Sequence, residues 1–173
     1  MREVSFVDWL QVGVQWLHVL AGITWFGAVI YGDFILIPAL MTVTPDVQRA
    51  AGGAIGSRAT KVIPGAAIAV IVLGILRGTV WGRIHGLSDV GTTYGILWLV
   101  ALVLAIGTFA FAKLVIEPGI ARINAIDPSE ATLADGRVNP AMTAAVDAVK
   151  RASLMELGLF LVIFTCMILM RFN

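Results

Sequence analysis

Ionisable side chains inside the long apolar runs of this sequence are the residues best suited to chemistry. His18 lies in the first run, between Trp16 and Trp25. A histidine at this depth in a membrane helix is costly to place in lipid, so it is expected to face the bundle interior or a cavity. Neutral imidazole is a common ligand of haem iron and of copper. We therefore predict that His18 is a ligand; the structural alternative is a hydrogen bond to a neighbouring helix.

Further candidate ligands are predicted on the same side of the membrane as His18. His85 lies in the connection after the second run, and Met167 and Met170 lie near the end of the last run. Thioethers ligate haem iron or Cu(I), although a solvated loop histidine and plain methionine packing are the more common explanations of such residues. Arg77 is suited to pairing with a haem propionate or a carboxylate substrate. Its alternative role is to snorkel toward the headgroups.

The tryptophans divide into two groups by their depth in the predicted spans. Trp9, Trp81 and Trp98 fall near span ends, where aromatic belts form at membrane interfaces. Trp16 and Trp25 lie deeper and are placed to flank a planar cofactor, with ordinary packing as the alternative. We include Trp25 among the cofactor-binding candidates.

Two carboxylates, Asp33 and Glu156, form a second group of candidates. Either would carry protons if it were buried without a partner, and both are therefore candidate catalytic residues. The structural alternative is an ion pair, which for Glu156 would involve Lys61, Lys113 or Arg151.

Composition identifies the whole chain as a membrane protein. Of its 173 residues, 59% are hydrophobic and only 13% are charged, whereas a soluble domain has about 25% charged residues. The net charge of +1 indicates no nucleic-acid surface, and two histidines with one cysteine exclude zinc-finger patterns. We therefore predict an all-α protein with a single membrane domain, residues 1–173, in contact with the lipid bilayer.

Four apolar runs are long enough to cross a bilayer, and they predict a four-helix bundle with long first and last helices. Pro38 is expected to kink the first helix, and Gly74 with Gly78 forms a GxxxG pattern that allows close helix approach. We identify no convincing internal repeat. The predicted spans cover about 9–41, 61–81, 92–116 and 150–171, and they are separated by larger loops at 42–60 and 117–149.

The distribution of basic residues predicts the orientation. Lys and Arg concentrate in the connections after the first and third spans, and the rule that positive charge stays inside places those loops in the cytoplasm. Both termini then lie on the outer, periplasmic side of the plasma membrane. The basic residues on the cytoplasmic side are Arg49, Arg58, Lys61, Lys113, Arg122, Arg137, Lys150 and Arg151.

Short motifs resemble two related membrane groups, the CopD-type copper resistance proteins and the HemJ-type protoporphyrinogen oxidases. Leu17-His18 followed by Trp25-Phe26-Gly27 is similar to their first helix. Pro64-Gly65 with Leu73-Gly74 in the second span, and Glu156 early in the last, are similar to HemJ-type proteins. The similarity extends loosely over the four spans.

The resemblance implies that His18 ligates b-type haem or, in the copper branch, handles copper. HemJ-type proteins carry a lysine early in the third span, where this chain has Tyr94 to Trp98 and no lysine before Lys113. Their last helix also has an asparagine before the glutamate, where this chain has Met155. These departures argue against protoporphyrinogen oxidation, even where haem binding is retained.

We therefore expect a haem-b-binding redox protein that transfers electrons between a quinone, a porphyrin or a redox-protein partner. A copper-handling protein that uses His18, Met167 and Met170 is the second expectation. A cofactor-free accessory subunit of a larger membrane complex, or a homo-oligomer, is the third, because 18 glycines suit tight helix contacts.

Overall fold

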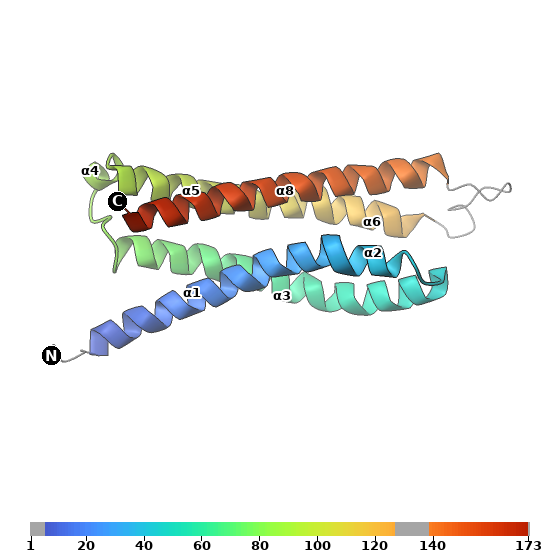
Figure 1. Ribbon diagram of the computed structural model, residues 1–173, viewed down its shortest axis with the longest axis horizontal. Helices are drawn as coiled ribbons and strands as arrows, with labels where there is room; N and C mark the ends of the chain where they lie inside the picture. The colour runs from blue at the N-terminus through green and yellow to red at the C-terminus, as the bar shows by residue number, and fades with distance from the viewer. Residues whose placement is uncertain (1–5, 127–138, 173) are drawn as a thin grey trace.

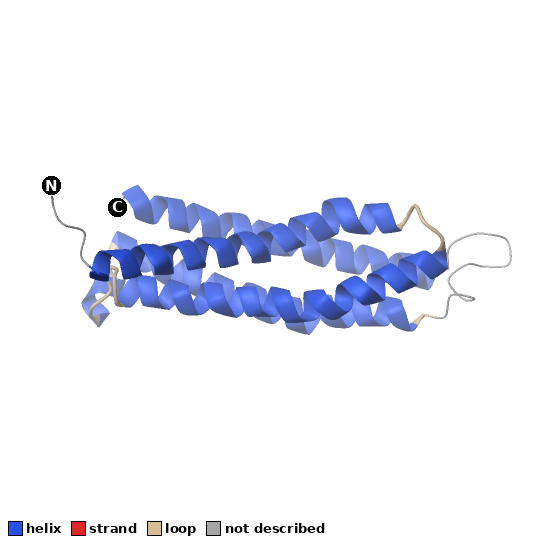
Figure 2. Cartoon of the chain, turned by 90° about the horizontal axis from the view of Figure 1, so that it is seen from below, coloured by secondary structure: helices blue, strands red, loops and turns tan. Residues whose placement is uncertain are grey.

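The computed structural model describes residues 6–126 and 139–172, and this part of the chain is helical with no strand. Four long helical segments run side by side in alternating directions, as Figure 1 and Figure 2 show. Both chain ends and the connection containing α4 lie at one end, here called the terminal end; the opposite end is called the far end. The elements in order are α1 (Phe6–Tyr31), η1 (Gly32–Leu36), α2 (Ile37–Leu40), α3 (Pro45–Thr79), α4 (Leu87–Val90), α5 (Thr93–Phe111), η2 (Ala112–Ile116), α6 (Glu117–Ala125) and α8 (Pro140–Phe172).

The four segments are long and apolar enough to cross a membrane, which confirms the predicted all-α, multi-pass bundle. The candidate spans are Trp9–Leu40, Asp46–Thr79, Thr93–Ala125 and Pro140–Phe172, of 32 to 34 residues each. At 1.5 Å per residue each is about 50 Å long, against a hydrocarbon core of about 30 Å. The helices therefore extend well beyond the hydrocarbon core.

Much of the two predicted larger loops is helical in the structure. Most of 42–60 belongs to α3, which begins at Pro45 and passes through Pro64 without a break. Residues Glu117–Ala125 form α6, and α8 begins at Pro140, where the Asn139 side chain accepts a hydrogen bond from the Ala141 amide. Residues 127–138 of the second predicted loop lie outside the described residues.

Proline shapes the first and third segments in the same way. The turn before Pro38 is a π-helix, Gly32–Leu36, and the turn before Pro118 is a π-helix, Ala112–Ile116. A proline lacks the amide hydrogen and clashes with the carbonyl one turn earlier, and a wider turn relieves both problems. The predicted kink at Pro38 thus takes the form of a π-turn. Each such segment pairs with the helix that follows it, so the bundle consists of two similar hairpins.

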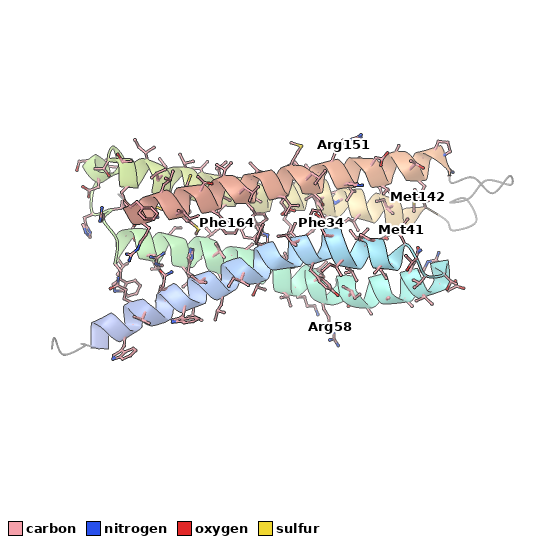
Figure 3. The ribbon with its side chains drawn as sticks, in the orientation of Figure 1. Phe34, Met41, Arg58, Met142, Arg151 and Phe164 are labelled. Atoms are coloured by element: carbon pink, nitrogen blue, oxygen red, sulfur yellow. The ribbon has the colours of Figure 1, made fainter. Side chains whose placement is uncertain are left out.

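The core lies at mid-depth and joins the two hairpins. It consists of buried side chains from all four segments: Trp25, Ala67, Val70, Ala101, Ala105, Phe160, Ile163 and Cys166. Aromatic rings dominate the contact between α1 and α8. Trp25 meets Phe160 edge to face with ring centroids 4.9 Å apart, and Phe26 contacts both Phe160 and Phe164. We call these four rings the aromatic layer; Phe164 is labelled in Figure 3.

The GxxxG pattern of α3 allows close approach, as predicted, but its two glycines face different helices. Gly74 lies against His18 of α1, and Gly78 lies against the indole of Trp98 of α5. The Trp98 Nε1 donates a hydrogen bond to the Gly74 carbonyl oxygen at 3.2 Å. This hydrogen bond fixes Trp98 in the helix contact.

Replacement of Gly78 by alanine is expected to destabilise the bundle by about 1–3 kcal/mol, because overpacking forces side chains and backbone to move. A Cβ at this position would overlap the Trp98 ring, which is held by its hydrogen bond. Thermal unfolding in detergent would measure the loss. Gly107→Ala is the matched control, since a Cβ there meets nothing within 4 Å; equal stability of the two variants would contradict the packing described here.

Candidate functional site

His18 is buried inside the bundle at the contact between α1 and α3. Its side chain is 5% exposed, although its neighbours along α1 face outward. A Cβ on Gly74 would lie 3.3 Å from the imidazole Cε1. The imidazole therefore occupies the space that the missing side chain leaves, with its Cε1 and Nδ1 atoms nearest to Gly74 of α3.

The imidazole has one nitrogen that makes no hydrogen bond with the described residues. Its Nδ1 is buried and has no hydrogen-bond partner among the described residues. The backbone of Val70 forms a hydrogen bond with the same ring. The guanidinium of Arg77 acts electrostatically on the His18 imidazole. A buried nitrogen lone pair that accepts no hydrogen bond raises the free energy of the folded state. Binding a metal ion through that lone pair would remove this penalty. We call His18 with Gly74 and Arg77 the histidine site.

Among the other predicted ligands, Met167 is placed best. It is partly buried against the core, next to the buried Cys166. His18 lies about seven residues before Trp25, and Met167 about seven after Phe160. Because Trp25 contacts Phe160 and the helices are antiparallel, equal rise places His18 and Met167 at the same depth. Met170 is half-buried one turn closer to the terminal end.

His85 does not share the buried environment of His18. It is exposed in the connection before α4, where its backbone amide donates to the Asp89 carboxylate at 2.8 Å. Within residues 6–126 and 139–172, no three His, Cys, Asp or Glu side chains come together in a group that could hold a metal ion. A metal at the histidine site would therefore depend on His18 with a thioether, a porphyrin or an external ligand.

The two deep tryptophans of α1 have different surroundings. Trp25 is buried in the core, where Phe160 packs edge-on against it. Trp16 is exposed on the outer face of α1. The structure thus gives Trp25 a packing role and directs Trp16 toward lipid.

Asp33 and Glu156 come together from different hairpins. Asp33 lies in η1, and Glu156 lies in α8, one turn after Ser153. Ser153 is hydrogen-bonded to the Asp33 side chain, and Asp33 is the charged group that acts on Glu156. We call Asp33, Ser153 and Glu156 the carboxyl site. Sequence position suggested the shared depth of the two acids, whereas the contact between Ser153 and Asp33 depends on how the hairpins pack.

None of the basic residues considered for Glu156 forms an ion pair with it in the described structure. Lys113 pairs instead with Glu117, at 2.6 Å between Nζ and Oε1. Lys61 and Arg151 are exposed. Thr108 of α5 is a further buried polar residue that sequence reasoning missed; its hydroxyl has no partner in the described part of the chain. One threonine in an apolar helix gives no sequence signal of its own.

The bundle thus has two polar sites, separated by the aromatic layer. The histidine site lies toward the terminal end and the carboxyl site toward the far end. No protein-family model, no curated protein and no solved structure matches the chain.

Proposed function

We propose that the chain is a haem-b-binding redox protein of the membrane, in which His18 is the axial ligand of the haem iron. The observation that carries this proposal is the buried imidazole nitrogen without a partner. A single histidine on a bundle helix is sufficient to hold a b-type haem iron at one axial position. The haem would supply one-electron redox chemistry.

The residues around His18 fit such a group. Gly74 lets the imidazole lie close to α3, which fixes the orientation of the ring. Arg77 acts on the imidazole from the same helix, and its guanidinium suits a haem propionate. Met167 lies at the depth of His18 and offers a thioether for the second axial position. Figure 1 shows α1 diverging from α8 toward its N-terminus.

Electron transfer to a quinone, a porphyrin or a redox protein is the activity that this arrangement supports best. The redox group would lie within the membrane, close to the terminal end, where lipid-soluble partners reach the outward faces of α1. Orientation in the plasma membrane with both termini outside belongs to the same proposal and rests on the distribution of Lys and Arg.

Haem binding is tested by the absorption spectrum of the purified protein with its haem content. The wild-type chain is expected to carry about one haem and show a Soret band, and His18→Ala is expected to lose the band because the iron loses its protein ligand. His85→Ala is the matched control, since His85 is exposed. A Soret band that persists in a folded His18→Ala variant would contradict the assignment.

A copper-handling protein is the second candidate, and the depth of Met167 beside Cys166 favours it. Imidazole, thioether and thiol are ligands that suit Cu(I). A colourless protein that binds one equivalent of copper, lost in His18→Ala and in Met167→Leu, would support this candidate over haem. A protein with neither metal nor pigment that co-purifies with other subunits would support an accessory role.

A further inference from the structure

We propose that Asp33 and Glu156 form a proton-binding site in which the two carboxyl groups share one exchangeable proton across the contact between the hairpins. This proposal does not depend on haem or copper at the histidine site, because the two sites lie on opposite sides of the aromatic layer. It gives the far-end half of the bundle an activity of its own.

The geometry brings the two acids together from separate elements. The π-turn η1 presents Asp33 to α8, and Ser153 and Glu156 are three residues apart on that helix, so they share one face. The hydrogen bond from Ser153 to Asp33 holds the first carboxyl group at this face. Glu156 is within electrostatic range of the same group.

Both carboxyl groups have unused hydrogen-bonding capacity. Glu156 is 4% exposed, and no hydrogen bond to it is found in the described part of the chain. One oxygen of Asp33, Oδ2, is buried and also has no partner among the described residues. A proton on one carboxyl group would convert that group into a hydrogen-bond donor, and a carboxyl oxygen that lacks a partner is where it would bind.

Among residues 6–126 and 139–172, no basic side chain in the surroundings would neutralise the pair. Lys113 of η2 forms an ion pair with Glu117 of α6. Arg58 of α3 and Arg151 of α8 point outward on opposite sides of the bundle (Figure 3). The remaining titratable groups of the packed elements at this depth are exposed: Tyr31, Lys61 and Lys150.

Two carboxylates that act on each other electrostatically resist ionising together when one of them, here Glu156, is buried, and such a pair titrates as a unit. The pair therefore binds one proton, which exchanges with solvent. The transfer is a simple proton equilibrium: a carboxylate oxygen forms an O–H bond with a proton taken from water, and the reverse step releases it.

The packing favours exchange with the far end. Toward the terminal end, Glu156 is followed one turn later by Phe160 and the other rings of the aromatic layer, which offer no proton acceptor. Toward the far end, η1 and α2 contain no buried residue. Protons are thus expected to reach the carboxyl site from the far end, which the distribution of basic residues assigns to the cytoplasm.

Infrared difference spectroscopy on the purified full-length chain tests the proposal. Acidification from mildly alkaline pH is expected to produce a C=O stretching band of a protonated carboxyl group that shifts in D₂O. The band should be lost in Glu156→Gln and lost or displaced in Asp33→Asn. Glu117→Gln is the matched control, because Glu117 is exposed and paired with Lys113.

Glutamine and asparagine have nearly the shape of the protonated acids, and circular dichroism would confirm that each variant folds. If one variant fails to fold, the other variant and the wild-type titration in H₂O and D₂O still show whether the carboxyl band arises from Asp33 and Glu156. A carboxyl band unchanged in both folded variants would overturn the proposal. A band that responds to Na⁺ at constant pH rather than to protons would also overturn it.

Discussion

Replacement of Phe160 by alanine is expected to lower the free energy of unfolding by about 3–5 kcal/mol, the usual cost of removing a buried aromatic side chain. Phe160 is 3% exposed and contacts Trp25, Phe26 and Phe164. These contacts connect α8 to α1, and thus one hairpin to the other. Lipid does not drive helices together as water does, so the cost arises from lost packing contacts and from the cavity left behind.

Equilibrium unfolding in mixed detergent micelles would measure this effect. The matched control is the adjacent Leu161→Ala, because Leu161 is 62% exposed and its side chain faces outward. Little change in Leu161→Ala with a large loss in Phe160→Ala is the predicted pattern. Equal losses in the two variants would show that the contact between the hairpins is not where the structure places it.

Replacement of Gly74 by valine is expected to reduce haem retention about 10–100-fold, the usual effect of disturbing the groups that orient a metal ligand. A Cβ alone would press on the His18 imidazole, and the two methyl groups of valine would enter the space that the ring occupies. The imidazole must then rotate or leave the contact, while His18 itself remains available as a ligand.

Haem titration into the purified variant, followed by gel filtration, would measure retention. Gly107→Val is the matched control, because Gly107 is an exposed helical glycine with open space around its Cα. Retention in Gly74→Val equal to that of the wild type would contradict the role of Gly74, even if His18 were the ligand.

The four apolar segments could be predicted from the sequence because a membrane helix must be apolar over its whole length. The unbroken continuation of α3 through the glycine-rich residues 52–56 could not. Gly52, Gly53 and Gly56 have low helix propensity and resemble a loop, yet these residues continue α3 beyond the apolar run. Pro64 is likewise accommodated within this helix.

The depth of each candidate residue along its helix could be predicted from the sequence, but the contacts between these residues could not. Helical rise alone places Asp33 and Glu156 toward the same end of the bundle, and burial cost alone identifies His18 as an inward-facing residue. The close contact of His18 with Gly74, and the hydrogen bond of Trp98 to the Gly74 carbonyl, depend on how α1, α3 and α5 pack. A single sequence does not specify that packing. The π-turn that presents Asp33 arises from Pro38 in the next turn, which by itself indicated only a kink.

The most direct measurement of the proposed function is a reduced-minus-oxidised absorption spectrum of the protein purified from membranes. If His18 ligates haem, dithionite is expected to produce the α-band of a reduced b-type haem and reoxidation to remove it, and His18→Ala is expected to abolish the band while His85→Ala leaves it intact. A folded, membrane-extracted wild-type protein that carries no haem, or a haem spectrum that survives in His18→Ala, would contradict the assignment of His18 as the ligand of a redox group.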